Sequence, residues 1–263
     1  MLNEHNSILC LGTPILIHGP LVNRFLFSAV RTALLMLILV SAPAAIGVRA
    51  AERAAEGQFR VCIDPGHPSE NSDGRELLNG LREVEINWTM AHALRALLEQ
   101  NGYAVVLTKN SLGEYVTNKR RAEIANAAGA DLMLRLHADS DGPSGFTIYH
   151  PRRPGEVKGV KGPSREMIEA SARAAKAFHA AVAQELGQRL KNNGVKGDEQ
   201  TFIGGKQGAL TGSIYSKVPT LLVEMAHLAK PDDAEWISRT ANQQVLARAL
   251  FAGVVAVAKA EAP

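Results

Sequence analysis

The stretch that decides the fold is VCIDPGH, residues Val61–His67. Its first three residues, Val61–Ile63, predict a buried strand, because β-branched residues fit a pleat that is packed on both faces. Pro65 cannot continue a central strand and Gly66 tolerates φ values that other residues avoid, so the chain turns here. In open α/β sheets ligands bind outside the carboxyl ends of the strands. His67 is therefore a candidate metal ligand or acid–base group.

Outward from this stretch, apolar strands alternate with helices whose apolar residues recur at helical spacing. This alternation indicates an α/β fold, a single three-layer domain with a mostly parallel central sheet and helices on both faces. A Gly/Pro-rich loop is expected at 151–163. Further strands are predicted at 104–108, 132–137, 146–149 and 218–224, and helices at 82–100, 118–128, 165–192 and 232–259.

The first fifty residues have the pattern of a secretory signal. Arg24 and Arg31 precede an apolar run at 32–40, and small residues follow it. The run is shorter than the roughly 20 apolar residues of a spanning helix, which favours cleavage over retention as a membrane anchor. We therefore expect a signal peptide at 1–50, a linker at 51–58 and a catalytic domain at 59–260 in an exported protein.

Composition excludes some classes of protein. The two cysteines, Cys10 and Cys62, are too few for a disulfide framework, and Cys62 reads as a buried thiol within its strand. The chain carries a net charge of +3, and the leader holds three arginines and one glutamate, so the remainder carries +1. The nearly neutral charge after the leader, and the 5% of aromatic residues in the sequence, argue against a nucleic-acid-binding protein.

Titratable residues end three of the predicted strands. They are His67, His137 and Glu224, and Glu83 lies in the first turn of the helix that follows the first strand. The carboxyl ends of parallel strands lie at one edge of a sheet, so these four side chains are expected to meet. Two imidazoles and one carboxylate make an open zinc site with water in the fourth position. A second carboxylate can move the proton of that water, which suits hydrolysis of an amide.

Each candidate also has a structural interpretation. Glu83 and Glu85 compete as the ligand, and Glu83 is preferred because it lies three residues before Ile86, on the apolar side of the helix. Glu83 could instead be an acidic residue of the first helical turn that the helix dipole stabilises, and His137 could be a core histidine bonded to backbone. Glu224 follows three apolar residues, so its carboxylate requires a partner or a function, because unpaired burial is costly.

Three further residues have open roles at this level. His227 could line the site or be structural. Asp64 is expected to shape the turn or to orient a ligand histidine rather than to bind metal. Arg121 could be a solvated helix charge or could pair with an acid near the site.

Four ordered motifs resemble those of the zinc-dependent N-acetylmuramoyl-L-alanine amidases of the bacterial cell wall. The opening motif is at 63–67, the Glu-containing helix start at 83–87, the central block at 121–126 and 130–140, and the closing motif at 218–224. The similarity runs from about Phe59 to Ala258, nearly the whole chain after the leader.

The resemblance implies one Zn²⁺ ion held by His67, Glu83 and His137, with Glu224 as the catalytic acid–base. It implies hydrolysis of the peptidoglycan amide between N-acetylmuramic acid and L-alanine, in the periplasm or cell wall. Nucleic acid is not an expected partner, the membrane is reached only through an uncleaved leader, and the need for an activator protein stays open. The alternatives are a secreted zinc peptidase acting on another amide and a non-catalytic wall-binding module.

Overall fold

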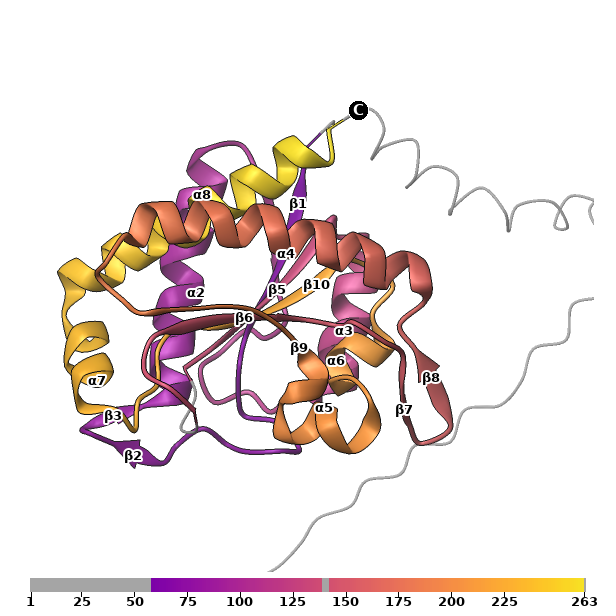
Figure 1. Cartoon of the computed structure of the whole chain (residues 1–263), viewed down its shortest axis with the longest axis horizontal. Coiled ribbons are helices and arrows are strands. Elements are labelled where there is room, and N and C mark those ends of the chain that lie inside the picture. Colours follow the sequence, from indigo (N-terminus) through magenta and orange to yellow (C-terminus); the bar gives the residue numbers. More distant parts are fainter. Residues whose placement is uncertain (1–57, 139–141, 263) are drawn as a thin grey trace, which may run out of the picture. The chain divides into compact units, whose positions relative to one another are not determined.

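A six-stranded sheet runs through the computed structural model in the order β4-β1-β5-β10-β6-β9 (Figure 1). Residues 58–138 and 142–262 are described, so the expected signal peptide and nearly all of the linker lie outside the described residues. Four strands are parallel, whereas β6 and β9 run the opposite way. The strands are β1 Arg60–Pro65, β4 Ala104–Leu107, β5 Leu132–His137, β6 Phe146–His150, β9 Asn192–Gly197 and β10 Thr220–Glu224.

Helices cover both faces of the sheet, which confirms the predicted three-layer α/β fold (Figure 1). One layer contains α2 Glu83–Gln100, α4 Arg165–Leu186 and α8 Thr240–Ala260. The other face carries α3 Asn118–Ala128 and the short α6 Thr211–Tyr215. The remaining elements are the 3₁₀ turn η1 Asp198–Gln200, the helices α5 Phe202–Gln207 and α7 Pro231–Ser238, and two hairpins, β2 Leu77–Leu78 with β3 Leu81–Arg82 and β7 Gly155–Val157 with β8 Val160–Gly162.

The central strands divide their side chains between an apolar face and a polar one, because successive residues of a strand point to opposite faces. Residues such as Ile63, Leu134 and Val223 are buried in the large core formed with α2, α4 and α8. Asp64 and Arg135 alternate with them and are register partners across β1 and β5. The polar face therefore carries charge next to the carboxyl edge of the sheet.

Four details differ from the sequence-based expectation. The helix predicted at 165–192 ends at Leu186, because Gly187 takes φ +57° and ends the helical hydrogen bonding. The helix predicted at 232–259 is two helices, which an extended Arg239 separates. The loop at 151–163 contains the β7–β8 hairpin. The segment between α4 and β10, for which no element was predicted, holds β9, η1, α5 and α6.

Candidate metal centre

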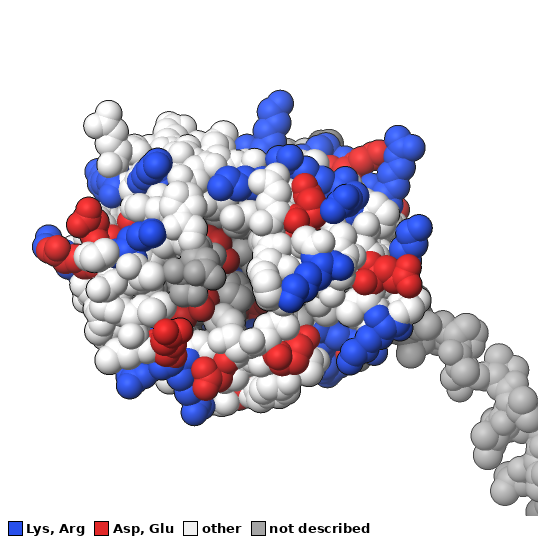
Figure 2. All heavy atoms as spheres, turned by 60° about the horizontal axis from the view of Figure 1, so that its bottom comes forward, with Lys and Arg blue, Asp and Glu red and all other residues white. Residues whose placement is uncertain are grey.

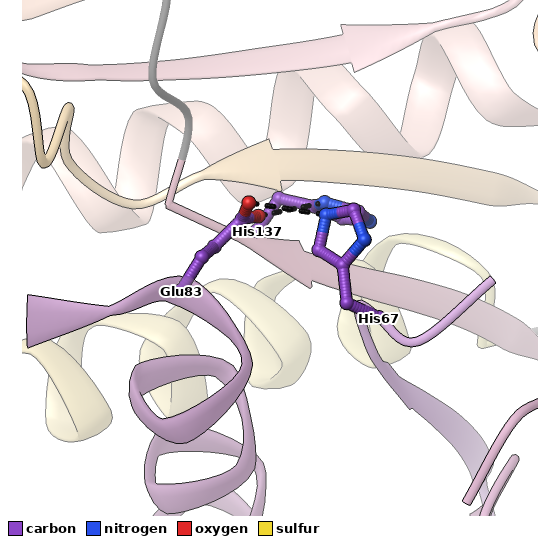
Figure 3. A group of neighbouring side chains, drawn as sticks. All are labelled: His67, Glu83 and His137. Atoms are coloured by element: carbon purple, nitrogen blue, oxygen red, sulfur yellow. Dashed lines mark hydrogen bonds and ion pairs between the residues drawn. The ribbon is translucent and has the colours of Figure 1, made fainter. Parts of the chain in front are cut away.

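Two histidines and one glutamate meet at the carboxyl edge of the sheet, as expected from the strand ends. Nε2 of His67 lies 3.0 Å from Oε2 of Glu83, and Nδ1 of His137 lies 3.0 Å from Oε1 of the same carboxylate. The candidate ligand atoms of the three residues all lie within 4.8 Å of one another. Figure 3 shows the carboxylate of Glu83, in the first turn of α2, pointing toward both imidazole rings.

Backbone groups and the side chain of Asn87 fix the orientation of His67 and Glu83. Nδ1 of His67 lies 3.0 Å from the carbonyl oxygen of Ser72, which can only accept a hydrogen bond, so Nδ1 donates and Nε2 is the ring nitrogen left to bind an ion. Oε1 of Glu83 accepts hydrogen bonds from the backbone N–H of Ala138, at 3.2 Å, and from the amide of Asn87, at 3.2 Å. Hydrogen bonds to a ligand in this way restrict its rotamer before an ion binds.

The protonation states of Glu83 and His137 suit a metal, whereas His67 must release a proton to bind one. Burial alone would raise the pKa of Glu83, but hydrogen bonds from His137 and His67 outweigh it and hold that pKa far below its ordinary value. Burial lowers the pKa of His137. Burial also opposes protonation of His67, yet its bond to the Glu83 carboxylate raises the pKa overall. Metals bind carboxylate and neutral imidazole, which are the forms that Glu83 and His137 favour at neutral pH.

The donor set and its spacing fit zinc. Two ligand atoms about 2.1 Å from an ion at a tetrahedral angle lie roughly 3.4 Å apart, close to the spacing in this cluster. Three protein ligands leave a fourth position open, as in catalytic rather than structural zinc sites. Glu85, the competing acid, has a side chain 50% exposed and faces Arg82 at 3.4 Å. The geometry therefore favours Glu83 as the carboxylate of this cluster.

Glu224 lies beside the cluster. It is the register partner of His137 across β10 and β5, and the residue is 7% exposed. A cleft of about 460 Å³ is lined by Glu224 together with all three candidate ligands. Figure 2 looks onto the carboxyl edge of the sheet and shows a hollow near the middle of that face, with acidic side chains inside it. The four residues expected to meet are thus brought to one cleft.

Asp64 and Arg121 form a buried pair behind the turn that carries His67. Nη1 of Arg121 lies 2.5 Å from Oδ1 of Asp64, and both residues are fully buried. The same guanidinium donates to the carbonyl oxygens of Pro65, at 2.7 Å, and Pro68, at 2.8 Å. Burial would raise the pKa of Asp64, but the neighbouring guanidiniums hold it well below its ordinary value. Of the two roles considered for each residue, Asp64 shapes the turn and Arg121 pairs with an acid.

Sequence reasoning missed two cations near the centre. Lys109 is fully buried, and its ammonium donates to the carbonyl oxygens of His67 and Leu112. Arg135 is 3% exposed, lines the cleft and donates from Nε to Asp64 at 2.8 Å. Both could have been found, since Lys109 follows a strand that ends at the same edge. Arg135 is a charged residue inside an apolar strand, two positions before His137.

His227 does not line the cleft, although it follows Glu224 closely in the chain. It is 1% exposed, and within the described part of the chain neither ring nitrogen has a hydrogen-bond partner. Its backbone N–H donates to Asp233 at 2.9 Å, and a Cβ added at Gly142 would meet its ring at 2.9 Å. Of the two interpretations of His227, the structure favours the structural one, in which the ring packs in the interior and does not line the cleft.

Comparisons with known proteins agree with this arrangement. The model of a family described as N-acetylmuramoyl-L-alanine amidase matches residues 61–256. LytC of Bacillus subtilis is 28% identical over 198 residues, which cover 74% of this chain and 34% of LytC. Rv3717 of Mycobacterium tuberculosis is 26% identical over 220 residues, covering 74% of this chain and 84% of Rv3717. This chain spans about a third of the length of LytC and of two further Bacillus amidases.

Solved structures show the same fold. The amidase AmiC2 of Nostoc punctiforme superposes with a TM-score of 0.59 at 22% identity, covering 75% of this chain and 95% of AmiC2. Ami1 of Mycobacterium smegmatis superposes with a TM-score of 0.62 at 18% identity, covering 77% and 98%. The family model spans β1 to α8 and includes every residue of the candidate centre. The chain therefore belongs to the N-acetylmuramoyl-L-alanine amidase family.

Proposed function

We propose that this chain is a zinc-dependent hydrolase of peptidoglycan that cleaves the amide between N-acetylmuramic acid and L-alanine. The observation that carries the proposal is the convergence of His67, Glu83 and His137 in a cleft that Glu224 also lines. Membership of the amidase family supports the substrate. Two imidazoles, one ligand carboxylate and one further carboxylate are the groups that metal-assisted amide hydrolysis requires.

The proposed roles follow from the positions of the side chains. Zinc held by His67, Glu83 and His137 would polarise the scissile carbonyl and lower the pKa of bound water to about 7. Glu224 accepts the proton of the attacking water and delivers it to the nitrogen of the leaving L-alanine, which then departs as an amine. Arg121 is a positioning residue, because its hydrogen bonds to the carbonyl oxygens of Pro65 and Pro68 fix the turn that carries His67.

Digestion of purified sacculi tests this proposal. The protein is loaded with zinc, its metal content is measured, and the soluble products are identified by mass spectrometry. We expect glycan strands without peptides, stem peptides with a free L-alanine amino terminus, and loss of both products after chelation. L-Alanine left on the glycan would indicate a peptidase, and binding to sacculi without release would indicate a wall-binding module.

Export is part of the proposal. The leader pattern at 1–50 supports it, and the substrate lies outside the cytoplasmic membrane. Amino-terminal sequencing of the protein recovered from the periplasm or wall fraction of its host tests it. A mature chain that begins near Ala51 is expected, whereas a chain that keeps its leader in the membrane fraction would show an anchor.

A further inference from the structure

Two guanidiniums share one carboxylate on the polar face of the sheet, beside the cleft. The carboxylate of Asp64 faces two guanidiniums, those of Arg121 and Arg135, and all three side chains are at most 4% exposed. Asp198, which is also buried, interacts electrostatically with Arg135, so the charge of this guanidinium is shared between carboxyl groups rather than left in excess. A guanidinium can still bind an anion where one of its nitrogens has no hydrogen-bond partner and reaches the cleft.

Of the two cations, Arg135 is the one that reaches the cleft. All three nitrogens of Arg121 donate to Asp64 or to backbone carbonyls, and Arg121 does not line the cleft. Arg135 uses Nε for Asp64 and Nη2 for the side chain of Asn118. Its Nη1 makes no hydrogen bond to the residues that the structure describes, and it packs against Gly212, where an added Cβ would lie 2.8 Å from it.

The distance from the metal centre suits the second residue of a peptide. Arg135 and His137 are two residues apart on β5 and face the same side, which places them about 7 Å apart along the strand. Two residues of an extended peptide also span about 7 Å. When the amide nitrogen of L-alanine lies at the centre, the main-chain carboxyl of the next residue can therefore reach the guanidinium.

We propose that Arg135 binds the free α-carboxylate of the second stem residue and makes the enzyme selective for it. This inference rests on the proposed function. In peptidoglycan the second residue is a D-glutamate joined through its side-chain carboxyl, so its α-carboxyl is free in some walls and amidated in others. A guanidinium N–H bonds a carboxylate more strongly than a carboxamide, because the hydrogen bond to the carboxylate is charge-assisted at both ends.

Two disaccharide tetrapeptides that differ only at this group provide the test. One has the free α-carboxylate and the other the carboxamide, and kcat/KM for release of the tetrapeptide is measured for each with the zinc-loaded full chain. For the native protein we expect a ratio of about 10 to 100 in favour of the free acid, as one charge-assisted hydrogen bond predicts. Arg135→Gln should bring the ratio near 1, and Arg135→Lys should keep part of it.

Two further variants separate binding from folding. Arg121→Lys changes the other cation on Asp64 and should lower kcat/KM for both substrates alike, with the ratio unchanged. Gly212→Ala keeps the charge but places a methyl group against Nη1 of Arg135, so the ratio should fall even if Arg135→Gln does not fold. Equal hydrolysis of both substrates by the native protein would overturn this inference alone. So would a ratio that is unchanged in Arg135→Gln or, if that variant does not fold, in Gly212→Ala. Hydrolysis of neither substrate at the lactyl–alanine amide would overturn the proposed function as well.

Discussion

Glu224 and His137 are register partners on the parallel strands β10 and β5, so one side chain lies next to the other on the same face of the sheet. This relationship joins the candidate acid–base to a candidate ligand through the backbone pairing of two central strands. Because the pairing lies within the sheet, the distance between the two groups depends on the register and not on a loop.

Glu224→Gln should keep the metal and lose turnover. Glutamine has the shape of glutamate but cannot accept the proton of the attacking water, and such proton transfers contribute about 10²- to 10⁴-fold to the rate. The measurements are zinc content per chain and the rate of stem-peptide release from sacculi. A variant with near-native turnover would contradict the mechanism.

Glu83→Gln should weaken zinc binding far more than Glu85→Gln. The Glu83 carboxylate lies 3.0 Å from both candidate ligand histidines, whereas the Glu85 side chain is 50% exposed near Arg82. Loss of a ligand is expected to lower affinity by at least the 10- to 100-fold seen for groups that only orient ligands. Competition with a chromophoric chelator measures it, and equal affinities for the two variants would reject Glu83 as the ligand.

Asp64→Asn should destabilise the fold strongly. It leaves the guanidiniums of Arg121 and Arg135 buried without a countercharge, and breaking a buried pair in this way costs about 3–5 kcal/mol. For a domain of this size the melting temperature should fall by roughly 6–20 °C. Glu235→Gln, which removes an exposed pair with Arg239, is the control and should change stability by less than about 1 kcal/mol.

Asp198→Asn should stabilise the protein in a pH-dependent way. Burial raises the pKa of Asp198 from 3.8 to about 6, so the folded state binds a proton that the unfolded state releases. The native protein therefore loses about 3 kcal/mol of stability as the pH rises from about 4 to about 7, through the folded-state pKa of Asp198. Urea titrations at pH 4 and 8 check this, with exposed Asp232→Asn as control. An equal effect of Asp198→Asn at both pH values would contradict the shift.

The elements that carry the site could be predicted because their signals are local. Apolar runs mark β1, β5 and β10, and the residue type at each strand end is visible in the sequence. The convergence of His67, His137 and Glu224 then follows from parallel pairing, as does the place of Glu83 at the start of the next helix. Their proposed roles in metal binding and proton transfer stay predictions.

The features that could not be predicted depend on contacts between distant segments. The helices α5 and α6 have only six and five residues, too few for a helical repeat to be recognised, and tertiary packing stabilises them. The choice between a solvated and a paired Arg121 depends on where α3 packs, which no local pattern shows. The break at Arg239 lies inside a continuous helical pattern, so its position is set by the packing of α7 and α8.

The division of the central strands into an apolar and a polar face has a consequence for protein engineering. Positions that point toward α2, α4 and α8 belong to the large hydrophobic core, while Leu222, at an alternate position, lines the cleft. A mutagenesis library confined to cleft-lining positions, without the candidate ligands, Glu224 and the charged group around Asp64, can therefore vary substrate preference while leaving the large hydrophobic core unaltered.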